Sequence, residues 1–207
     1  MKETILNKSL KLFIQHGFKS ITMDDIAKDL GISKKTIYQH FPSKNELVKA
    51  TVDYVFNTAS ARMKEIIGTC ETPIHEHFVI KNCVGDLFGY NIKASTIYQF
   101  NKYYPKLAER IQKKRHDDYD FTIVRNLKDG VEKGYYRPNL DIEFVGRLFF
   151  TTSDVFYNNE NFTESQSAHS VSELNYKFLE YHLRAIVTPK GLEILEQLLK
   201  THDTNEI

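Results

Sequence analysis

The chain has 207 residues, of which 41% are hydrophobic and 27% charged, and its formal net charge is +1. These proportions are typical of a globular protein and exclude a disordered or collagen-like chain. No run approaches the roughly 18 apolar residues of a membrane span, and the N-terminus lacks the apolar core of a signal peptide, so we expect a cytoplasmic protein. Only 9 glycines and 5 prolines occur, which favours helices over many short strands.

The charge is distributed unevenly along the chain. Residues 1–50 contain nine lysines and five acidic residues and therefore have a charge of +4, whereas the remainder has −3. A basic N-terminal part is the electrostatic pattern of a region that binds a polyanion such as DNA. A lysine-rich face that is only solvated gives the same pattern.

The first thirty residues predict two helices. Apolar positions at helical spacing over 5–13 indicate an amphipathic helix, which Gly17 ends. Thr22 and Asp25 have the spacing of a capping box, so a second helix should begin after Thr22. This helix is short, because Gly31 ends it.

A third short helix and the start of a long one follow. Ser33 is a second N-cap, and Ile37 with Phe41 forms the buried side of a helix that stops before Pro42. Ser43 repeats the capping pattern and begins a helix that extends to about residue 67. Two short helices joined by a glycine-containing turn match the helix-turn-helix arrangement.

The outward face of the third helix consists of polar side chains. These are donors of the kind that read base edges or hold phosphates in a major groove, although a solvated helix face explains them as well. The residues are Lys34, Lys35, Thr36, Gln39 and His40.

The stretch from Ile21 to Leu47, ITMDDIAKDLGISKKTIYQHFPSKNEL, strongly resembles the DNA-binding domain of the TetR family of bacterial transcriptional regulators, and LFIQHGF in the first helix extends the resemblance. The resemblance implies an all-α homodimer. Residues 1–46 would form a three-helix DNA-binding domain with the helix-turn-helix, and residues 47–207 a larger helical domain that binds a small-molecule effector and dimerises. Most members repress transcription until the effector releases them from a pseudo-palindromic operator.

By position, the resemblance implies DNA-binding roles for eight residues. The positions that contact phosphates are Thr22, Ser33, Tyr38 and Lys44. The positions that read bases or adjacent phosphates are Lys34, Lys35, Thr36 and His40. Many members have a small residue where this chain has Lys35, so the operator sequence cannot be taken from a relative.

After residue 47 the pattern predicts about seven more helices and no strand. The helix over 141–157 should begin after Asp141, with its inner side formed by Phe144, Val145, Leu148, Phe149 and Thr152. Residues 158–170 are polar and predict a loop, and Thr188 with Pro189 begins a last helix. By the resemblance, the helices over 141–157 and 171–187 would pair with those of a second copy; an intrachain core explains their apolar faces equally well.

Aromatic residues are frequent in the middle of the larger domain, which predicts a cavity for an apolar or planar effector. Core packing is the alternative interpretation. The candidate ligand-binding residues are Phe88, Tyr98, Phe100, Phe121, Arg125 and Phe150, with Asp154 as a further polar candidate.

No motif in the chain predicts catalysis or a cofactor. A metal site is not expected either, because the spacing of Cys70, His75, His77 and Cys83 fits no standard ligand pattern. We therefore expect a regulator and not an enzyme. Two other functions remain open. One is an architectural DNA-binding protein without operator specificity, and the other is a helical small-molecule-binding or enzymatic protein whose N-terminal helices no longer bind DNA.

Overall fold

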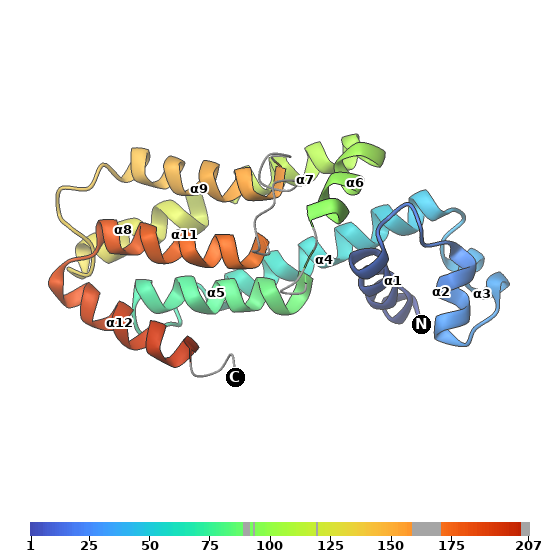
Figure 1. Cartoon of the computed structure of the whole chain (residues 1–207), viewed down its shortest axis with the longest axis horizontal. Helices are drawn as coiled ribbons and strands as arrows, with labels where there is room; N and C mark the ends of the chain where they lie inside the picture. The colour runs from blue at the N-terminus through green and yellow to red at the C-terminus, as the bar shows by residue number, and fades with distance from the viewer. Residues whose placement is uncertain (89–91, 93, 119, 159–170, 204–207) are drawn as a thin grey trace.

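The computed structural model describes residues 1–88, 92, 94–118, 120–158 and 171–203. Over these residues the regular elements are helices, and the one β-bridge joins Tyr136 to Val187. The expectation of an all-α protein is confirmed. The molecule is elongated, with α1, α2 and α3 at one end (Figure 1).

The helices follow the chain in this order: α1 (Lys2–His16), α2 (Met23–Leu30), α3 (Lys34–His40), α4 (Lys44–Ile66), α5 (Pro73–Phe88), α6 (Ala94–Tyr103), α7 (Pro105–Asp117), α8 (Arg125–Glu132), α9 (Ile142–Asn158), α11 (Val171–Ile186) and α12 (Pro189–Asp203). A short π-helix, η1 (Asp120–Val124), leads directly into α8. None of the described helices has both the length and the hydrophobicity needed to cross a membrane. Residues 159–170, most of the predicted loop, lie outside the described part of the chain.

The N-terminal helices begin and end where their capping residues predict. The Thr22 hydroxyl accepts a hydrogen bond from the Asp25 amide, and the Asp25 carboxylate accepts one from the Thr22 amide, which completes the predicted capping box. Gly31 ends α2 in the left-handed region with a φ of 65°. Ser33 caps α3 by accepting from the Thr36 amide. The local sequence therefore determines the helix-turn-helix geometry directly.

A first hydrophobic core holds α1, α2 and α3 against the beginning of α4. Its fully buried side chains include Ile5, Phe13, Ile26, Ile37 and Leu47. Burial of each such side chain contributes about 1.5–3 kcal/mol. The same core includes Ile111 of α7, so the later helices pack onto this end of the molecule.

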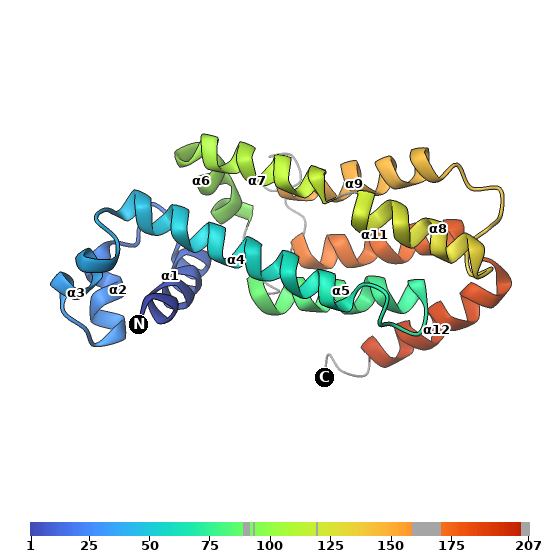
Figure 2. The ribbon, with the colours of Figure 1, turned by 180° about the vertical axis from the view of Figure 1, so that it is seen from behind.

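A second core lies at the opposite end and joins α5, α8, α11 and α12. It includes Ile74, Leu127, Tyr136, Leu183 and Leu195. Helix α4 connects the two ends: its 23 residues span about 35 Å, and both views show it running from the N-terminal helices along α5 (Figures 1 and 2).

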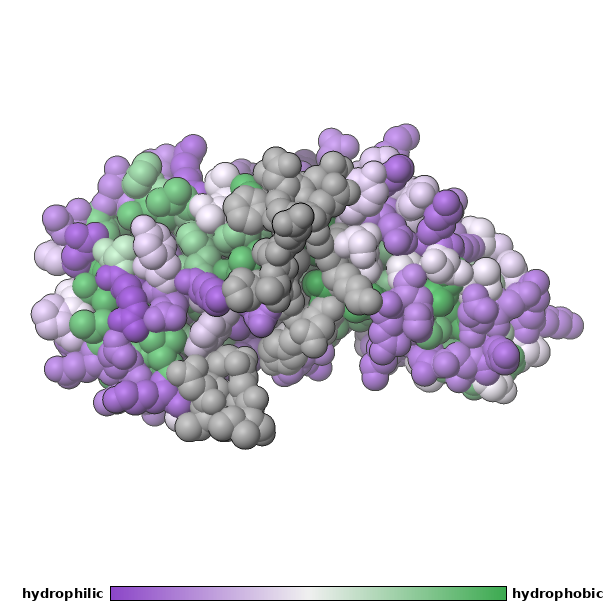
Figure 3. Space-filling model, in the orientation of Figure 1, coloured by the Kyte–Doolittle hydropathy of each residue, from purple (hydrophilic) through white to green (hydrophobic). Residues whose placement is uncertain are grey.

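Helix α9 differs from the sequence prediction in one respect. Val145 and Phe149 pack against the second core, as expected, but Phe144 is 63% and Leu148 50% exposed. The prediction that Phe144 and Leu148 face inward is wrong for the single chain. They occupy a second apolar strip about 100° around the helix, and Figure 3 shows hydrophobic residues at the surface over α9.

Candidate nucleic-acid interface

At the start of α2, the hydroxyl and the amide of Thr22 are already hydrogen-bonded to Asp25. The Thr22 hydroxyl and the Thr22 amide both donate to Asp25 Oδ2, at 2.7 and 2.8 Å. These hydrogen bonds lower the pKa of the Asp25 carboxyl. A phosphate at this point must replace Asp25 as acceptor or bind the first-turn amides of α2, which have no partner within the helix.

Helix α3 presents its polar face to solvent, as the sequence predicts. Ile37 is fully buried, whereas Lys35 and His40 are exposed. Ser33 Oγ and Thr36 Oγ1 lie 2.8 Å apart and share a hydrogen bond, so these two hydroxyls are fixed relative to each other. The helix therefore has one side anchored in the core and one side available to a groove.

Lys34 joins α3 to α2 through an ion pair. Its Nζ lies 2.8 Å from Asp24 Oδ1, and this contact raises the pKa of Lys34. The same ammonium group lies 5.8 Å from the centre of the Tyr38 ring, which is 42% exposed. Because both members of the Lys34–Asp24 pair are exposed, a DNA phosphate can displace Asp24 at little cost.

Lys44 lies at the start of α4 and is half-buried. Its Nζ donates to the carbonyl oxygen of Lys19 at 3.1 Å, and burial lowers its pKa. An ammonium group has three donors, so the bond to Lys19 leaves two for a phosphate. Lys19 and Asp24 were not expected among the contacts of this region, since no local pattern relates either residue to its lysine partner.

All eight candidate DNA-binding residues thus lie in α2, α3 and α4 or directly before them, at one end of the molecule (Figure 1). Residues 5–51 match the sequence model of the family described as bacterial regulatory proteins, tetR family. The N-terminal helices are therefore similar to the DNA-binding domain of TetR-family regulators. The predicted resemblance is therefore confirmed.

Known proteins similar over most of the chain are regulators as well. The transcriptional repressor KstR2 of Mycolicibacterium smegmatis is 25% identical over 162 residues, which are 73% of this chain and 75% of that protein. The transcriptional regulator UidR of Escherichia coli is 27% identical over 144 residues, 70% of this chain and 73% of that one. These relatives are transcriptional regulators and not enzymes, in agreement with the expectation from sequence.

The fold extends the similarity to the whole chain. A TetR-family regulator from Marinobacter aquaeolei superposes with a TM-score of 0.73 at 18% identity, covering 97% of this chain and 98% of that one. TetR-family regulators bind DNA and form dimers. The fold of the chain is therefore similar to that of this regulator beyond the N-terminal helices as well.

The predicted ligand-binding residues whose side chains the structure describes have different sets of contacts. Phe100 packs on Phe18 beside the first core, with ring centres 5.2 Å apart, and the Tyr98 hydroxyl accepts from Lys102. Phe121 is exposed on η1, and Phe150 lies 5.8 Å from the His116 ring. Arg125 pairs with Glu76 near the second core. The side chain of Phe88 lies outside the described part of the structure.

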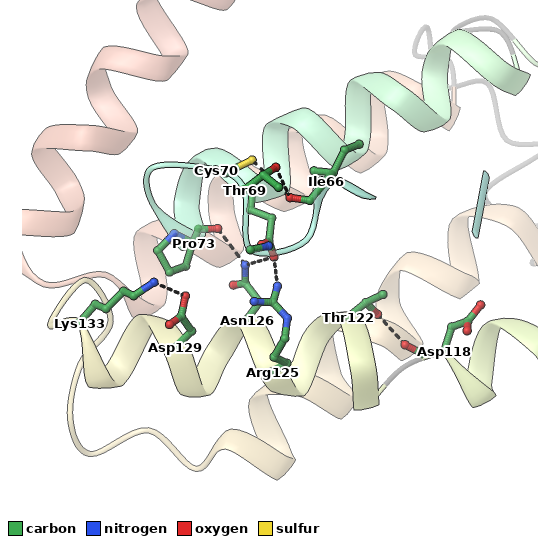
Figure 4. A network of polar contacts seen from close by, with 12 residues as sticks. Ile66, Thr69, Cys70, Pro73, Asp118, Thr122, Arg125, Asn126, Asp129 and Lys133 are labelled. Carbon is green, nitrogen blue, oxygen red and sulfur yellow. Dashed lines mark hydrogen bonds and ion pairs between the residues drawn. The ribbon is translucent and has the colours of Figure 1, made fainter. Parts of the chain in front are cut away.

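A buried polar network explains the position of Arg125. The Glu76 carboxylate, which is almost fully buried, pairs with Arg125 and accepts from Asn126 Nδ2 at 2.8 Å and from the Gly68 amide at 3.0 Å. Asn126 Oδ1 accepts from the Tyr136 hydroxyl at 3.0 Å. Figure 4 shows Arg125 and Asn126 extending together from α8 toward α5. The network ties the loop after α4 to α5 and α8, and it compensates the buried charge of Glu76.

Two histidine rings lie close to Phe149: that of His182, which is buried, and that of His77, which is half-buried. The ring centre of Phe149 is 4.5 Å from that of His182 and 5.6 Å from that of His77. Burial lowers the pKa of His77 to about 4 and, with a repulsive contribution from His77, that of His182 to about 3. Both imidazoles are therefore neutral at physiological pH.

Proposed function

We propose that this protein is a homodimeric transcriptional regulator, specifically a repressor that a small-molecule effector releases from a pseudo-palindromic operator. The observation that carries this proposal is the exposed polar face of α3, flanked by the starts of α2 and α4, within residues that match the TetR family. Residues 1–46 form the DNA-binding domain and residues 47–207 the effector and dimerisation domain. Such a protein acts on the chromosome and hence in the cytoplasm.

In this proposal α3 is the recognition helix and lies in a major groove. The residues that read base edges or adjacent phosphates are Lys34, Lys35, Thr36 and His40. The residues that hold phosphates on either side are Thr22, Ser33, Tyr38 and Lys44. Phosphate contacts orient the domain on the duplex, and contacts to bases select the sequence.

The exposed strip of α9 supports a symmetric dimer. Phe144 and Leu148 are exposed on α9, and Tyr181 of the neighbouring α11 is 74% exposed. Large apolar side chains that are exposed on packed helices are typical of an interface, and a two-fold axis buries the same surface on both copies. Four helices, two from each copy, would then hold the recognition helices about 34 Å apart, one turn of DNA.

The effector should bind in the larger domain, with Phe150 the best-placed of the aromatic candidates. Phe150 lies between α9 and α7, near His116 and near Arg115, whose guanidinium is 5.9 Å from the ring centre. Arg115 also pairs with Asp154 at 2.7 Å. An aromatic ring beside a paired cation and carboxylate suits a planar effector with a polar end.

The test measures DNA affinity with fluorescently labelled duplexes, selected by the protein from a random library. Tyr38→Ala and Lys44→Ala should weaken binding to selected and unrelated duplexes alike, because both remove phosphate contacts. Lys128→Ala is the matched control, since Lys128 is an exposed lysine on α8, far from α3. Unchanged affinity in the first two variants would contradict the docking. Tight binding without any selected sequence would instead indicate an architectural DNA-binding protein.

A further inference from the structure

Helix α6 contacts the N-terminal helices directly. Thr96 Oγ1 donates to the carbonyl oxygen of Ile14 at 3.2 Å, and Gln99 Oε1 accepts from the Lys19 amide at 3.2 Å. Phe18, in the turn between α1 and α2, packs on Phe100. Besides the covalent connection through α4, the larger domain therefore also contacts the N-terminal helices through α6.

The side-chain amide of Gln99 lies where a side chain at position 17 would otherwise be, and this position is Gly17. A Cβ atom at Gly17 would lie 2.5 Å from Gln99 Oε1 and 2.9 Å from Gln99 Nε2. Gly17 also has a φ of 85°, which side chains rarely adopt. The turn after α1 thus allows the amide of Gln99 to approach the backbone closely and meet the Lys19 N–H.

The backbone of Lys19 forms hydrogen bonds with both Gln99 and Lys44. The Lys19 amide donates to Gln99, and the Lys19 carbonyl oxygen accepts from Lys44 Nζ at 3.1 Å. Two hydrogen bonds in series therefore connect α6 to the ammonium group at the start of α4. They involve the backbone of one residue, so a displacement of Lys19 moves both.

We infer that Gln99 is a positioning residue for DNA binding: it fixes the backbone of Lys19, which in turn orients the Lys44 ammonium group toward a DNA phosphate. The inference rests on the proposed function, because it assumes that Lys44 contacts DNA. It assigns to α6 a part in determining DNA affinity. A shift of α6 relative to α1 breaks the first hydrogen bond and leaves Lys44 less well oriented.

The test compares four purified full-length variants on the selected duplex at several salt concentrations. Gln99→Met keeps the length of the side chain but removes the acceptor for the Lys19 amide. Thr96→Val is the matched control, because it removes the other α6 hydrogen bond to this region without touching Lys19. Lys44→Met removes the ammonium group, and the double variant Gln99→Met/Lys44→Met tests whether the two residues act on one contact.

Gln99→Met should weaken DNA binding about fivefold, the effect of one hydrogen bond, and Thr96→Val should bind as the wild type does. Lys44→Met should lower the slope of log affinity against log salt by about 0.9, the value for one phosphate. In the Lys44→Met background, Gln99→Met should have no further effect. A merely structural role of Gln99 would weaken binding equally in both backgrounds.

Wild-type affinity in Gln99→Met, or the same loss in both backgrounds, overturns the inference. Gln99→Ala provides a second measurement if circular dichroism shows that Gln99→Met is poorly folded. Unchanged binding by Lys44→Met overturns the inference and leaves operator binding itself standing. A wild-type protein that binds no DNA overturns the proposed function instead.

Discussion

His77 and His182 should make the stability of the protein fall between about pH 7 and pH 5. Burial lowers the pKa of His77 to about 4 and that of His182 to about 3, from an ordinary value of 6.5. In the unfolded chain both imidazoles bind protons below about pH 6.5, whereas in the folded protein they stay neutral. Their contribution to stability is therefore fully present above pH 6.5 and is lost as the pH falls toward 4.

The magnitude follows from the difference in bound protons. At about pH 5 the unfolded chain holds nearly one proton on each histidine and the folded protein holds few. One pKa unit corresponds to about 1.4 kcal/mol, so each histidine lowers the free energy of unfolding by about 2 kcal/mol over this range. The sum, about 4 kcal/mol, is a large part of the usual 5–15 kcal/mol of a folded protein.

Urea unfolding followed by far-ultraviolet circular dichroism measures this loss, with the protein concentration held fixed because a dimer's stability depends on it. His182→Gln and His77→Gln should each remove about half of the pH dependence, since each removes one titrating group. His16→Gln, which changes an exposed histidine, should leave the pH dependence unchanged. Equal losses in the wild type, in His77→Gln and in His182→Gln would show that these two histidines do not cause the pH dependence.

Three further variants test other parts of the structure. Tyr136→Phe should lower the free energy of unfolding by about 0.5–1.5 kcal/mol, because it removes the hydrogen bond from the Tyr136 hydroxyl to the buried Asn126 Oδ1; an unchanged urea midpoint would contradict this. Leu148→Glu should shift the dimer toward monomer in sedimentation velocity, and a dimer of wild-type affinity would exclude α9 from the interface. Lys35→Ala should alter the base preference in a repeated duplex selection; an identical selected sequence would limit Lys35 to phosphate contacts.

The N-terminal helices could be predicted almost completely from the sequence, because their ends depend on local interactions. The Thr22–Asp25 capping box spans three residues, and Gly31 takes the conformation that the turn requires. Ser33 likewise caps α3 through its near neighbour. Residue types at fixed short spacings therefore determine where these helices begin and end.

The larger domain could be predicted only as a set of helices. On α9 the sequence has two apolar strips, and periodicity cannot tell which strip meets the chain's own core and which stays exposed like Phe144. The bond between Gln99 and Lys19 joins positions 80 residues apart, so no local pattern reveals it. Aromatic composition likewise did not distinguish Phe100, which packs beside the first core, from a ring that binds an effector.

A selection from fragments of the source genome measures whether the protein binds DNA with operator specificity. The purified protein would be mixed with the fragments at about 150 mM salt, where non-specific binding to phosphates is weak. Operator-specific binding by a homodimer should enrich a pseudo-palindrome whose half-site centres lie about one helical turn, or a multiple of it, apart. A folded dimer that enriches no sequence would contradict it.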